Sequence, residues 1–369
     1  MMAPPRLELP VVHLRRMLHL MRTLYHLHRL PGYQHRLAEQ LPEVARFDPG
    51  HDSVMMGYDF HLDAAGPQLI EVNTNAGGAL LAWRAYDATF APQPASDLPR
   101  RMERLLATFD REMTLCSGGR ITRPRRLLIV DEEPEKQFLA EEMHTLCALL
   151  SARGIHAALA DPRQLQGGEE GIFWHGQRVD LIYNRHCDFY LETEAMAAIR
   201  AAYLSRQLCL TPNPHSYGLL ADKRRMIFWQ DREAMAALGL GDRQQAVLAQ
   251  TIPPCQLLAD MQSEQVWQQR KQWVFKPVSA FGSRGVLLGD SISRQRFQGL
   301  DPYNTLVQRF IPPALEPQTA MKVDWRLFVY QNRLLGVAPR IYRGQVTNFR
   351  QPGSGYAPIC LVKGERERR

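Results

Sequence analysis

The feature of this sequence that most constrains its fold is a hairpin near the N-terminus, whose second strand alternates acidic and amide side chains with aliphatic ones. Residues 55–62 and 68–73 have the composition of two antiparallel strands, and residues 63–67 are the predicted turn. Side chains along a strand point alternately to its two faces. Glu71 and Asn73 are therefore expected on one face, opposite the neighbouring aliphatic side chains.

The polar face of this hairpin is a candidate site for a divalent cation. With the turn at 63–67, Asp59 lies alongside Glu71 and Asn73, whereas a shorter turn would place Asp63 there instead. Two carboxylates and an amide oxygen are hard ligands, which suit Mg²⁺ (or Mn²⁺) bridging the phosphates of a nucleotide and do not suit structural zinc. We expect Asp59, Glu71 and Asn73 to be the metal ligands. A plain surface strand is the alternative.

The middle of the chain alternates short apolar strands with helices. Strands are expected at 125–133, 155–160 and 179–184, and helices at 136–153 and 192–206. This alternation predicts a small parallel α/β domain.

A second chemical signal is a strand that leads into a glycine-rich turn, WVFKPVSAFGSRGVLL (273–288). Lys276 ends the strand, and the turn contains Ser283 between two glycines, so backbone N–H groups and a cationic side chain can approach phosphate oxygens. The segment is neither a Walker loop nor a GxGxxG motif opening a helix. An ordinary hairpin with a lysine at its tip is the alternative.

Further candidates follow near the C-terminus. The strand 305–310 runs into Pro-Pro, and such a strand end can offer backbone groups to an adenine edge, with Glu316 close enough to accept bonds from ribose hydroxyls. Asp324 and Arg326 are two apart on one strand and share a face. Arg340 ends the partner strand, so the two arginines can clamp phosphoryl or carboxylate oxygens. A core strand and a hairpin with exposed charges are the alternatives.

Together these segments resemble the ATP-grasp superfamily, of the circularly permuted, ATP-dependent carboxylate–amine ligase type. The resemblance spans about residues 55–360. It rests on these pieces: Lys223 in ADKRRM, Lys276 with GSRG, the strand VQRFI, Asp324-Trp-Arg326, Arg340 with Thr347-Asn348, and Asp59 with Glu71-Val-Asn73. The family's last motif comes first here, which is what a circular permutation would produce. The metal strands then need only pair with the 324–340 hairpin.

The resemblance implies an α/β (α+β) fold: a circularly permuted ATP-grasp fold with a Rossmann-like pre-ATP-grasp domain. The implied divisions are N-terminal helices (1–47), the permuted part of the core with the metal strands (48–122), the pre-ATP-grasp domain (123–214), the small nucleotide-binding subdomain (215–312) and the large subdomain (313–369).

The resemblance also implies roles for individual residues. Lys223, Lys276 and Ser283 would bind ATP phosphates, Gln308, Arg309, Phe310 and Ile311 would line the adenine pocket, and Glu316 would meet the ribose. Arg340, Asn348 and Arg326 would face the transferred phosphoryl group and the substrate, and Asn75 and Arg185 would contact the substrate. Arg309 stands where the family commonly has a glutamate.

The implied reaction is attack of a substrate carboxylate on the γ-phosphate of ATP, with Mg²⁺, to give an acylphosphate, from which an amine then displaces phosphate. The carboxylate and amine are expected to be small molecules or peptides. Four alternatives stay open: a thiol or hydroxyl acceptor, a kinase that stops after phosphoryl transfer, a non-catalytic ATP-binding module, and a nucleic-acid binder.

Charge and cysteine spacing narrow the remaining classes. The chain has 45 Lys and Arg against 38 Asp and Glu, for a net charge of +7, but no basic block of five, which disfavours nucleic acid. The six cysteines are isolated, without a CxxC pair, which argues against a zinc ribbon and a disulfide framework.

No apolar run approaches membrane-span length. Residues 11–30 are read as a packing helix. We expect a cytoplasmic protein, with a homodimer left open.

Overall fold

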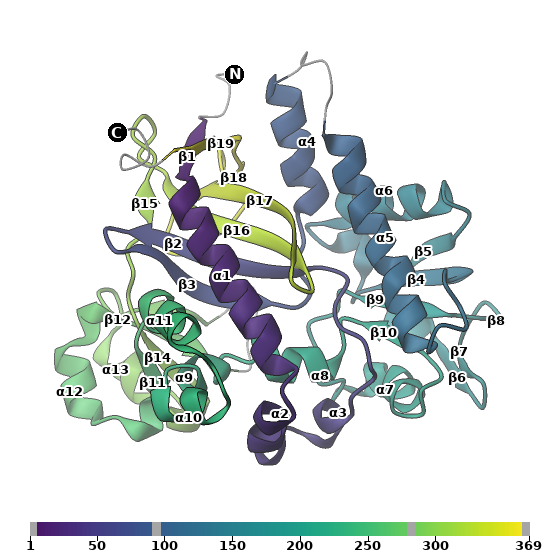
Figure 1. Cartoon of the computed structure of the whole chain (residues 1–369), viewed down its shortest axis with the longest axis horizontal. Coiled ribbons are helices and arrows are strands. Elements are labelled where there is room, and N and C mark those ends of the chain that lie inside the picture. The colour runs from purple at the N-terminus through teal and green to yellow at the C-terminus, as the bar shows by residue number, and fades with distance from the viewer. Residues whose placement is uncertain (1–5, 91–96, 279–284, 364–369) are drawn as a thin grey trace.

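A six-stranded antiparallel sheet lies at the centre of the molecule (Figure 1). The computed structural model describes residues 6–90, 97–278 and 285–363. The strand order of this sheet is β18-β17-β16-β2-β3, and β15 also pairs with β16. Its strands are β2 (Met56–Asp63), β3 (Gly66–Asn73), β15 (Ala314–Leu315), β16 (Lys322–Tyr330), β17 (Arg333–Tyr342) and β18 (Gly355–Tyr356).

The pairing of β2 with β16 joins segments from opposite ends of the chain. The two strands are antiparallel, and Asp59 of β2 stands directly opposite Arg326 of β16. The prediction that the acidic hairpin folds back beside the 324–340 hairpin is therefore confirmed.

One face of the central sheet is covered by helices from both halves of the chain. Trp325, Leu327 and Val329 of β16 point into this core. It is shared with α1 (Val11–His28) and α11 (Asp242–Thr251), which pack against each other and against β3. The expected packing role of the helix within 11–30 is confirmed, because its buried residues belong to this core.

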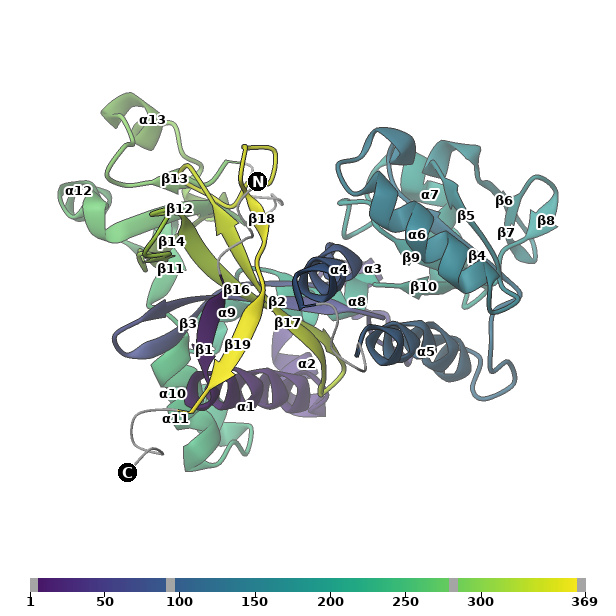
Figure 2. The same cartoon turned by 90° about the horizontal axis from the view of Figure 1, so that it is seen from above.

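The other face of the sheet changes character along β16. Asp324 and Arg326 face a cavity, whereas Phe328 packs in a second core with α4 (Ala79–Phe90) and α5 (Leu98–Cys116). Viewed from above, these two helices lie between the central sheet and a second sheet (Figure 2). The polar part of the face is thus left open for ligands.

The second sheet is wholly parallel, with strand order β10-β9-β4-β5, which confirms the predicted parallel α/β domain. Its strands are β4 (Arg126–Val130), β5 (His156–Ala160), β9 (Leu181–Asn184) and β10 (Cys209–Thr211), and its helices are α6 (Ala140–Ser151) and α7 (Ala197–Leu204). A small three-stranded sheet beside it was not foreseen; it comprises β6 (Gln166–Gly168), β7 (Gly171–Trp174) and β8 (Gln177–Arg178).

A third, antiparallel sheet has the order β11-β14-β12-β13. Its strands are β11 (Cys255–Leu257), β12 (Trp273–Pro277), β13 (Leu287–Leu288) and β14 (Thr305–Arg309). The helices around it are α9 (Arg225–Phe228), α10 (Arg232–Ala237), α12 (Ser263–Gln268) and α13 (Arg294–Gln298).

The sequence pattern also predicts helices at about 222–238 and 256–270, and both predictions were wrong. The helix expected at about 222–238 is divided, because the Asp231 carboxylate accepts a hydrogen bond from the Ala234 N–H and starts a new helix, α10. The segment 256–270 was expected to be one helix, but its first residues belong to strand β11, because residues 255–257 pair with β14. Long-range strand pairing here outweighs local helical propensity.

The described N-terminal region, from residue 6 onward, consists of helices preceded by a short strand. After α1 come α2 (Pro31–Leu37) and α3 (Glu43–Arg46), and α8 (Pro214–Ser216) follows the parallel sheet. β1 (Leu7–Pro10) pairs in parallel with β19 (Ile359–Val362), so both ends of the described chain lie side by side (Figure 1). None of the described helices has the length and apolar content required to cross a bilayer.

The contact between α4 and the central sheet depends on a missing side chain. A Cβ added at Gly336 of β17 would lie 2.5 Å from Trp83 Nε1 of α4. Gly336→Ala should therefore lower the free energy of unfolding by about 1–3 kcal/mol through overpacking. Urea denaturation measures this change. Gly355→Ala is the matched control, because nothing lies within 4 Å of its added Cβ. Equal effects of the two substitutions would contradict this packing argument.

Candidate active site

A cavity of about 470 Å³ lies where the polar face of the central sheet meets the third sheet and the loops of the parallel domain. Most predicted site residues line it. They are Asp59, Glu71, Asn73, Asn75, Arg185, Lys276, Gln308, Arg309, Phe310, Ile311, Arg326, Arg340 and Asn348. The fold thus brings together side chains from five separate segments of the chain.

The floor of the cavity is a buried ion-pair network centred on Asp59. Arg326 donates from Nε to Asp59 Oδ1 and from Nη2 to Oδ2, both at 2.6 Å, and Arg340 Nη2 lies 2.9 Å from Oδ2. Burial alone would raise the pKa of Asp59, but the charges of Arg326 and Arg340 outweigh it and hold the pKa well below its usual range. Asp59 is thus ionised and fully paired.

Arg340 is held from a second side by its cross-strand neighbour. Asp324 stands opposite Arg340 in the sheet and accepts a hydrogen bond from its Nε. The other oxygen of Asp324 accepts the Thr347 hydroxyl. Both predicted arginines therefore have fixed orientations, and the segment carrying Thr347 and Asn348 is tied to the sheet floor.

Glu71 and Asn73 lie beside this network at the edge of the cavity. Asn73 Nδ2 donates to Glu71 Oε1 at 3.1 Å and to Asp59 Oδ2 at 3.4 Å. Among the described residues, Glu71 and Asn73 are the members of the predicted metal trio whose oxygens are not held by guanidinium groups. They fit a hard cation by donor type. The role of Asp59 as a ligand stays a prediction.

Asp63 does not join this group. The turn is shorter than predicted, and Asp63 ends β2 at its tip, where Oδ1 accepts the N–H groups of Ala65 at 2.8 Å and Gly66 at 3.1 Å. The shorter turn nevertheless leaves Asp59 opposite Glu71, because β3 contains a bulge.

This bulge also corrects the expected alternation. Asp59 pairs with Glu71 and Phe60 pairs with Leu69, so Ile70 is an extra residue in β3. Ile70 and Glu71 both line the cavity, whereas Ile70 was expected on the opposite face. A bulge depends on the partner strand, and a two-residue period in one sequence does not reveal it.

Two buried lysines lie near Glu71. Lys276 Nζ donates to the Ile70 carbonyl oxygen, which the bulge exposes, at 2.9 Å. Burial lowers the pKa of Lys276 to about 8; the carboxylate of Glu71 opposes this shift, and the charge of Lys223 adds to it. Burial also lowers the pKa of Lys223, against the charges of Glu71 and Asp222. Lys223 lies in a turn before α9 and is not among the residues that line the cavity.

The strand end after β14 forms another wall. Gln308 is buried and donates from Nε2 to the Leu69 carbonyl at 3.5 Å, and Phe310 N–H donates to Gln272 O at 2.7 Å. His61 Nδ1 lies 2.7 Å from the Ile311 carbonyl, so the ring donates from this nitrogen. Burial lowers the pKa of His61, consistent with a neutral ring. The sequence had not singled out His61.

Two predicted nucleotide contacts lie elsewhere. Glu316 is not part of the cavity wall; Oε2 accepts the Gln318 N–H at 3.1 Å and the Thr319 N–H and hydroxyl at 2.6 Å, so it caps its own turn. Ser283 lies outside the described residues. The assignments of Glu316 to ribose and Ser283 to phosphate stay predictions.

The parallel domain closes the far side of the cavity. Arg185 Nη1 donates to the Asn75 carbonyl, and Asn75 Nδ2 donates back to the Arg185 carbonyl at 3.3 Å. A Cβ added at Gly77 would lie 2.5 Å from Arg185 Nη2, and one at Gly78 would lie 1.9 Å from the Tyr356 hydroxyl. These glycines permit the close approach of the loop to both side chains.

Several lining residues were missed. Asp131 directly follows β4, and the segment Gln137–Leu139 continues this loop. Asp131 stands at the carboxyl end of a parallel strand, where α/β sheets commonly bind ligands, so this signal was present in the sequence. Tyr356, whose hydroxyl donates to Gly77 O at 3.2 Å, had no comparable signal.

Comparison with solved structures finds similar folds at low sequence identity. A glutathione synthetase-like effector from Globodera pallida, in its apo form, matches with a TM-score of 0.60 and 11% identity, over 97% of this chain and 89% of that one. A putative gamma-glutamylcysteine synthetase from Methylobacillus flagellatus matches with a TM-score of 0.53 and 12% identity, over 94% and 86%. At these identities, the similarity shows a common fold. No protein-family model and no curated protein sequence matches the chain.

The ion pairs of Asp59 predict a large effect on stability. Asp59→Asn would leave Arg326 buried without its anionic partner and should lower the free energy of unfolding by about 3 kcal/mol in metal-free buffer. Chemical denaturation measures the loss. Asp63→Asn, at the turn tip, should change it by less than about 1 kcal/mol. If Asp59 acted only as a metal ligand, removing its charge in metal-free buffer would stabilise the protein, and this outcome would overturn the assignment.

Proposed function

We propose that this chain is a circularly permuted ATP-grasp ligase, which uses ATP and Mg²⁺ to join a carboxylate to an amine through an acylphosphate. The observation that carries the proposal is the convergence on one cavity of motif residues that are far apart in sequence, with the acidic hairpin beside β16. The folds of two proteins named as a glutathione synthetase-like effector and a putative gamma-glutamylcysteine synthetase support it.

The arrangement of strands supports the proposal that the fold is circularly permuted. β2 and β3 come first in sequence, yet they occupy one edge of a sheet whose other strands are C-terminal. Joining the adjacent ends at β1 and β19 would restore the motif order of the family. The four parallel strands with their helices are proposed as the Rossmann-like pre-ATP-grasp domain.

The charges around the cavity favour a polyanionic ligand. Among the described lining residues, basic side chains outnumber acidic ones. The basic ones are Arg185, Lys276, Arg309, Lys322, Arg326, Arg340 and Arg350, and the acidic ones are Asp59, Glu71, Asp131 and Asp324. Buried cations are costly unless they are paired, so the phosphates of ATP would neutralise charge that the protein itself leaves uncompensated.

In the proposed complex, Lys276 and Lys223 bind the phosphates, and the strand end at 308–311 holds the adenine. Glu71 and Asn73, with Asp59 as the predicted third member, would hold Mg²⁺, which would supply charge neutralisation at the transferring phosphoryl group. Their carboxylate and amide oxygens fit this hard cation.

The reaction divides into two displacements. A substrate carboxylate oxygen forms a bond to the γ-phosphorus while the bond to the β,γ-bridging oxygen breaks, and ADP leaves. An amine nitrogen then attacks the acyl carbon, phosphate leaves, and the amine loses a proton. Arg340 and Arg326, oriented by Asp324 and Asp59, would stabilise the charge on the phosphoryl and acyl oxygens.

The carboxylate substrate is proposed to lie on the side of the parallel domain. Arg185 presents a guanidinium to the cavity there, and Asn75 and the adjacent glycines bound the space. A guanidinium suits recognition of a carboxylate, from a small molecule or a peptide.

The proposal predicts that removing one carboxylate charge abolishes catalysis. Glu71→Gln should lower ATP-dependent phosphate release by about 100-fold or more, because the metal loses a charged ligand. Phosphate release and product mass are measured in a screen of amino acids and polyamines with ATP and Mg²⁺. Asp63→Asn is the control and should retain activity.

Full turnover by Glu71→Gln would refute the site. ADP formation without a new amide in any pairing would favour the kinase, and a thioester product would identify a thiol acceptor.

Nucleotide affinity should fall as the pH rises above about 8. Phosphate binding stabilises charged Lys276 and raises its pKa from the value of about 8 in the free protein. The affinity for ATP is therefore highest below this pH and declines by up to about tenfold per pH unit above it. Calorimetric titration with ATP between about pH 7 and pH 10 measures the effect. Lys276→Arg keeps its charge throughout and should show a flatter profile. Parallel profiles of both proteins would contradict the role of Lys276.

A further inference from the structure

Outside the cavity, three side chains with soft or borderline ligand atoms meet at the end of α5. His51 precedes β2, Cys116 is the last residue of α5, and Cys209 is the first residue of β10. One ligand atom from each lies within 4.8 Å of the other two. None of the three lines the cavity. The cysteines are isolated in the sequence, so only the fold brings them together.

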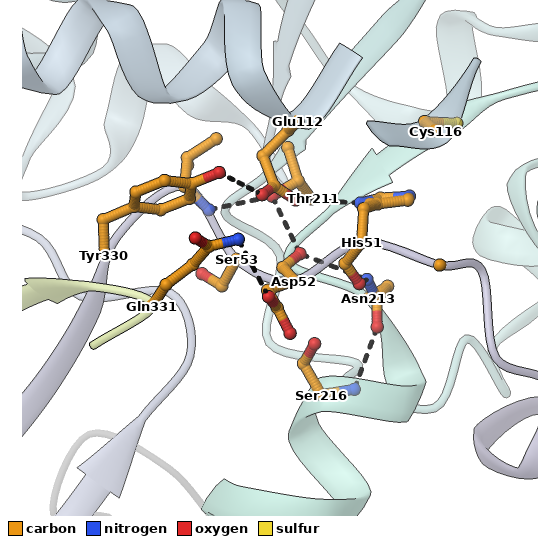
Figure 3. A network of polar contacts seen from close by, with 12 residues as sticks. His51, Asp52, Ser53, Glu112, Cys116, Thr211, Asn213, Ser216, Tyr330 and Gln331 are labelled. Carbon is orange, nitrogen blue, oxygen red and sulfur yellow. Dashed lines mark hydrogen bonds and ion pairs between the residues drawn. The ribbon is translucent and has the colours of Figure 1, made fainter. Parts of the chain in front are cut away.

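The imidazole of His51 is oriented by a buried carboxylate. His51 Nδ1 donates to Glu112 Oε2 at 2.9 Å, and the Tyr330 hydroxyl donates to Glu112 Oε1 at 2.7 Å (Figure 3). In a neutral ring with the proton on Nδ1, the lone pair that a metal would use is on Nε2. Nε2 is fully buried and makes no hydrogen bond of normal geometry to any described residue. One ligand atom each of His51, Cys116 and Cys209 lies within 4.8 Å of the other two, so this edge of the ring lies toward the thiols.

We propose that His51, Cys116 and Cys209 bind one Zn²⁺ ion. Two thiolates and an imidazole are a ligand set that zinc prefers. Zinc bonds of about 2.3 Å to sulfur and about 2.0 Å to nitrogen place the ligand atoms roughly 3.5 Å apart in a tetrahedral site. The observed group, within 4.8 Å, therefore needs only a small closure around the ion.

Glu112 supplies the support that such a site requires. A histidine that ligates a metal usually donates its other ring N–H to a carboxylate, which fixes the ring and raises its basicity. The contact between His51 and Glu112 has this form, and both side chains are buried. An ordinary core histidine would explain the bond to Glu112 but not the two thiols gathered at its other nitrogen.

Cys116 is half-buried, whereas His51 and Cys209 are buried, so solvent can approach the site from the side of Cys116. No further His, Cys, Asp or Glu of the described chain completes the group. The nearby Thr211 hydroxyl is already used, because it accepts Val54 N–H and donates to Asp52 O. Water therefore fills the fourth position.

The bound ion cross-links three parts of the fold. It ties the segment before β2 to α5 and to the edge strand β10 of the parallel sheet, at a junction where Asn213 Nδ2 also donates to the His51 and Asp52 carbonyls at 3.1 and 3.2 Å. The ion would therefore stabilise the junction between the central sheet and the parallel domain.

Cobalt provides a direct test, because tetrahedral Co²⁺ with thiolate ligands has charge-transfer absorption that other sites lack. Metal-free, reduced protein should bind one equivalent of Co²⁺ with this absorption, and Zn²⁺ should displace it and raise the melting temperature. Cys116→Ser should abolish the absorption. Cys147→Ser, which changes another half-buried cysteine on α6, should retain it. Glu112→Gln should weaken Co²⁺ binding by about 10- to 100-fold without removing a ligand.

Two outcomes would overturn the zinc site: no thiolate-to-cobalt absorption in the wild-type protein, or equal absorption in Cys116→Ser. Circular dichroism of Cys116→Ser verifies that the variant is folded. The absorption measures coordination, so the result is independent of ligase activity.

Discussion

The pairing of β2 with β16 is the constraint on which the rest of the structure depends. It aligns Asp59 with Arg326, two residues from opposite ends of the chain, and their ion pair is buried at the cavity floor. Arg340 is held in position by ion pairs with the same carboxylate and with Asp324. Without this pairing, the acidic hairpin would have no sheet to join, and the basic side chains would have no partner. One strand interface therefore sets both the fold and the charge pattern of the site.

The cavity contains carboxylates that are held in ion pairs, and a buried lysine that forms none of these pairs. Asp59 and Asp324 both form ion pairs with arginine, whereas the buried ammonium of Lys276 donates to the Ile70 carbonyl oxygen. A buried ammonium that is solvated by one carbonyl is poorly stabilised, which is why its pKa is lowered. Such a group favours an arriving anion. The sheet floor therefore orients the arginines, and in the proposed complex the lysines would attract the phosphates.

Sequence reasoning was most accurate where local pattern is sufficient. The strands around Glu71, Lys276 and Arg326 were identified because their polar residues alternate with aliphatic ones. Sequence reasoning failed where the local structure is set by a neighbouring strand, as for the bulge at Ile70 and for strand β11. Glu316 caps its own turn, a role that a single glutamate in a loop does not reveal.

The sequence by itself indicated the strands around the site, most of the side chains that share a face, and that acids, amides and lysines occur in motifs whose cyclic order resembles that of one ligase family. Only the tertiary structure decided that Asp59 is paired with two arginines while Asp63 caps a turn, and that His51 meets Cys116 and Cys209. The reason is physical. Periodicity is fixed by neighbours along the backbone, whereas ion pairs and ligand clusters form between residues that are distant in sequence, and their partners are set by packing.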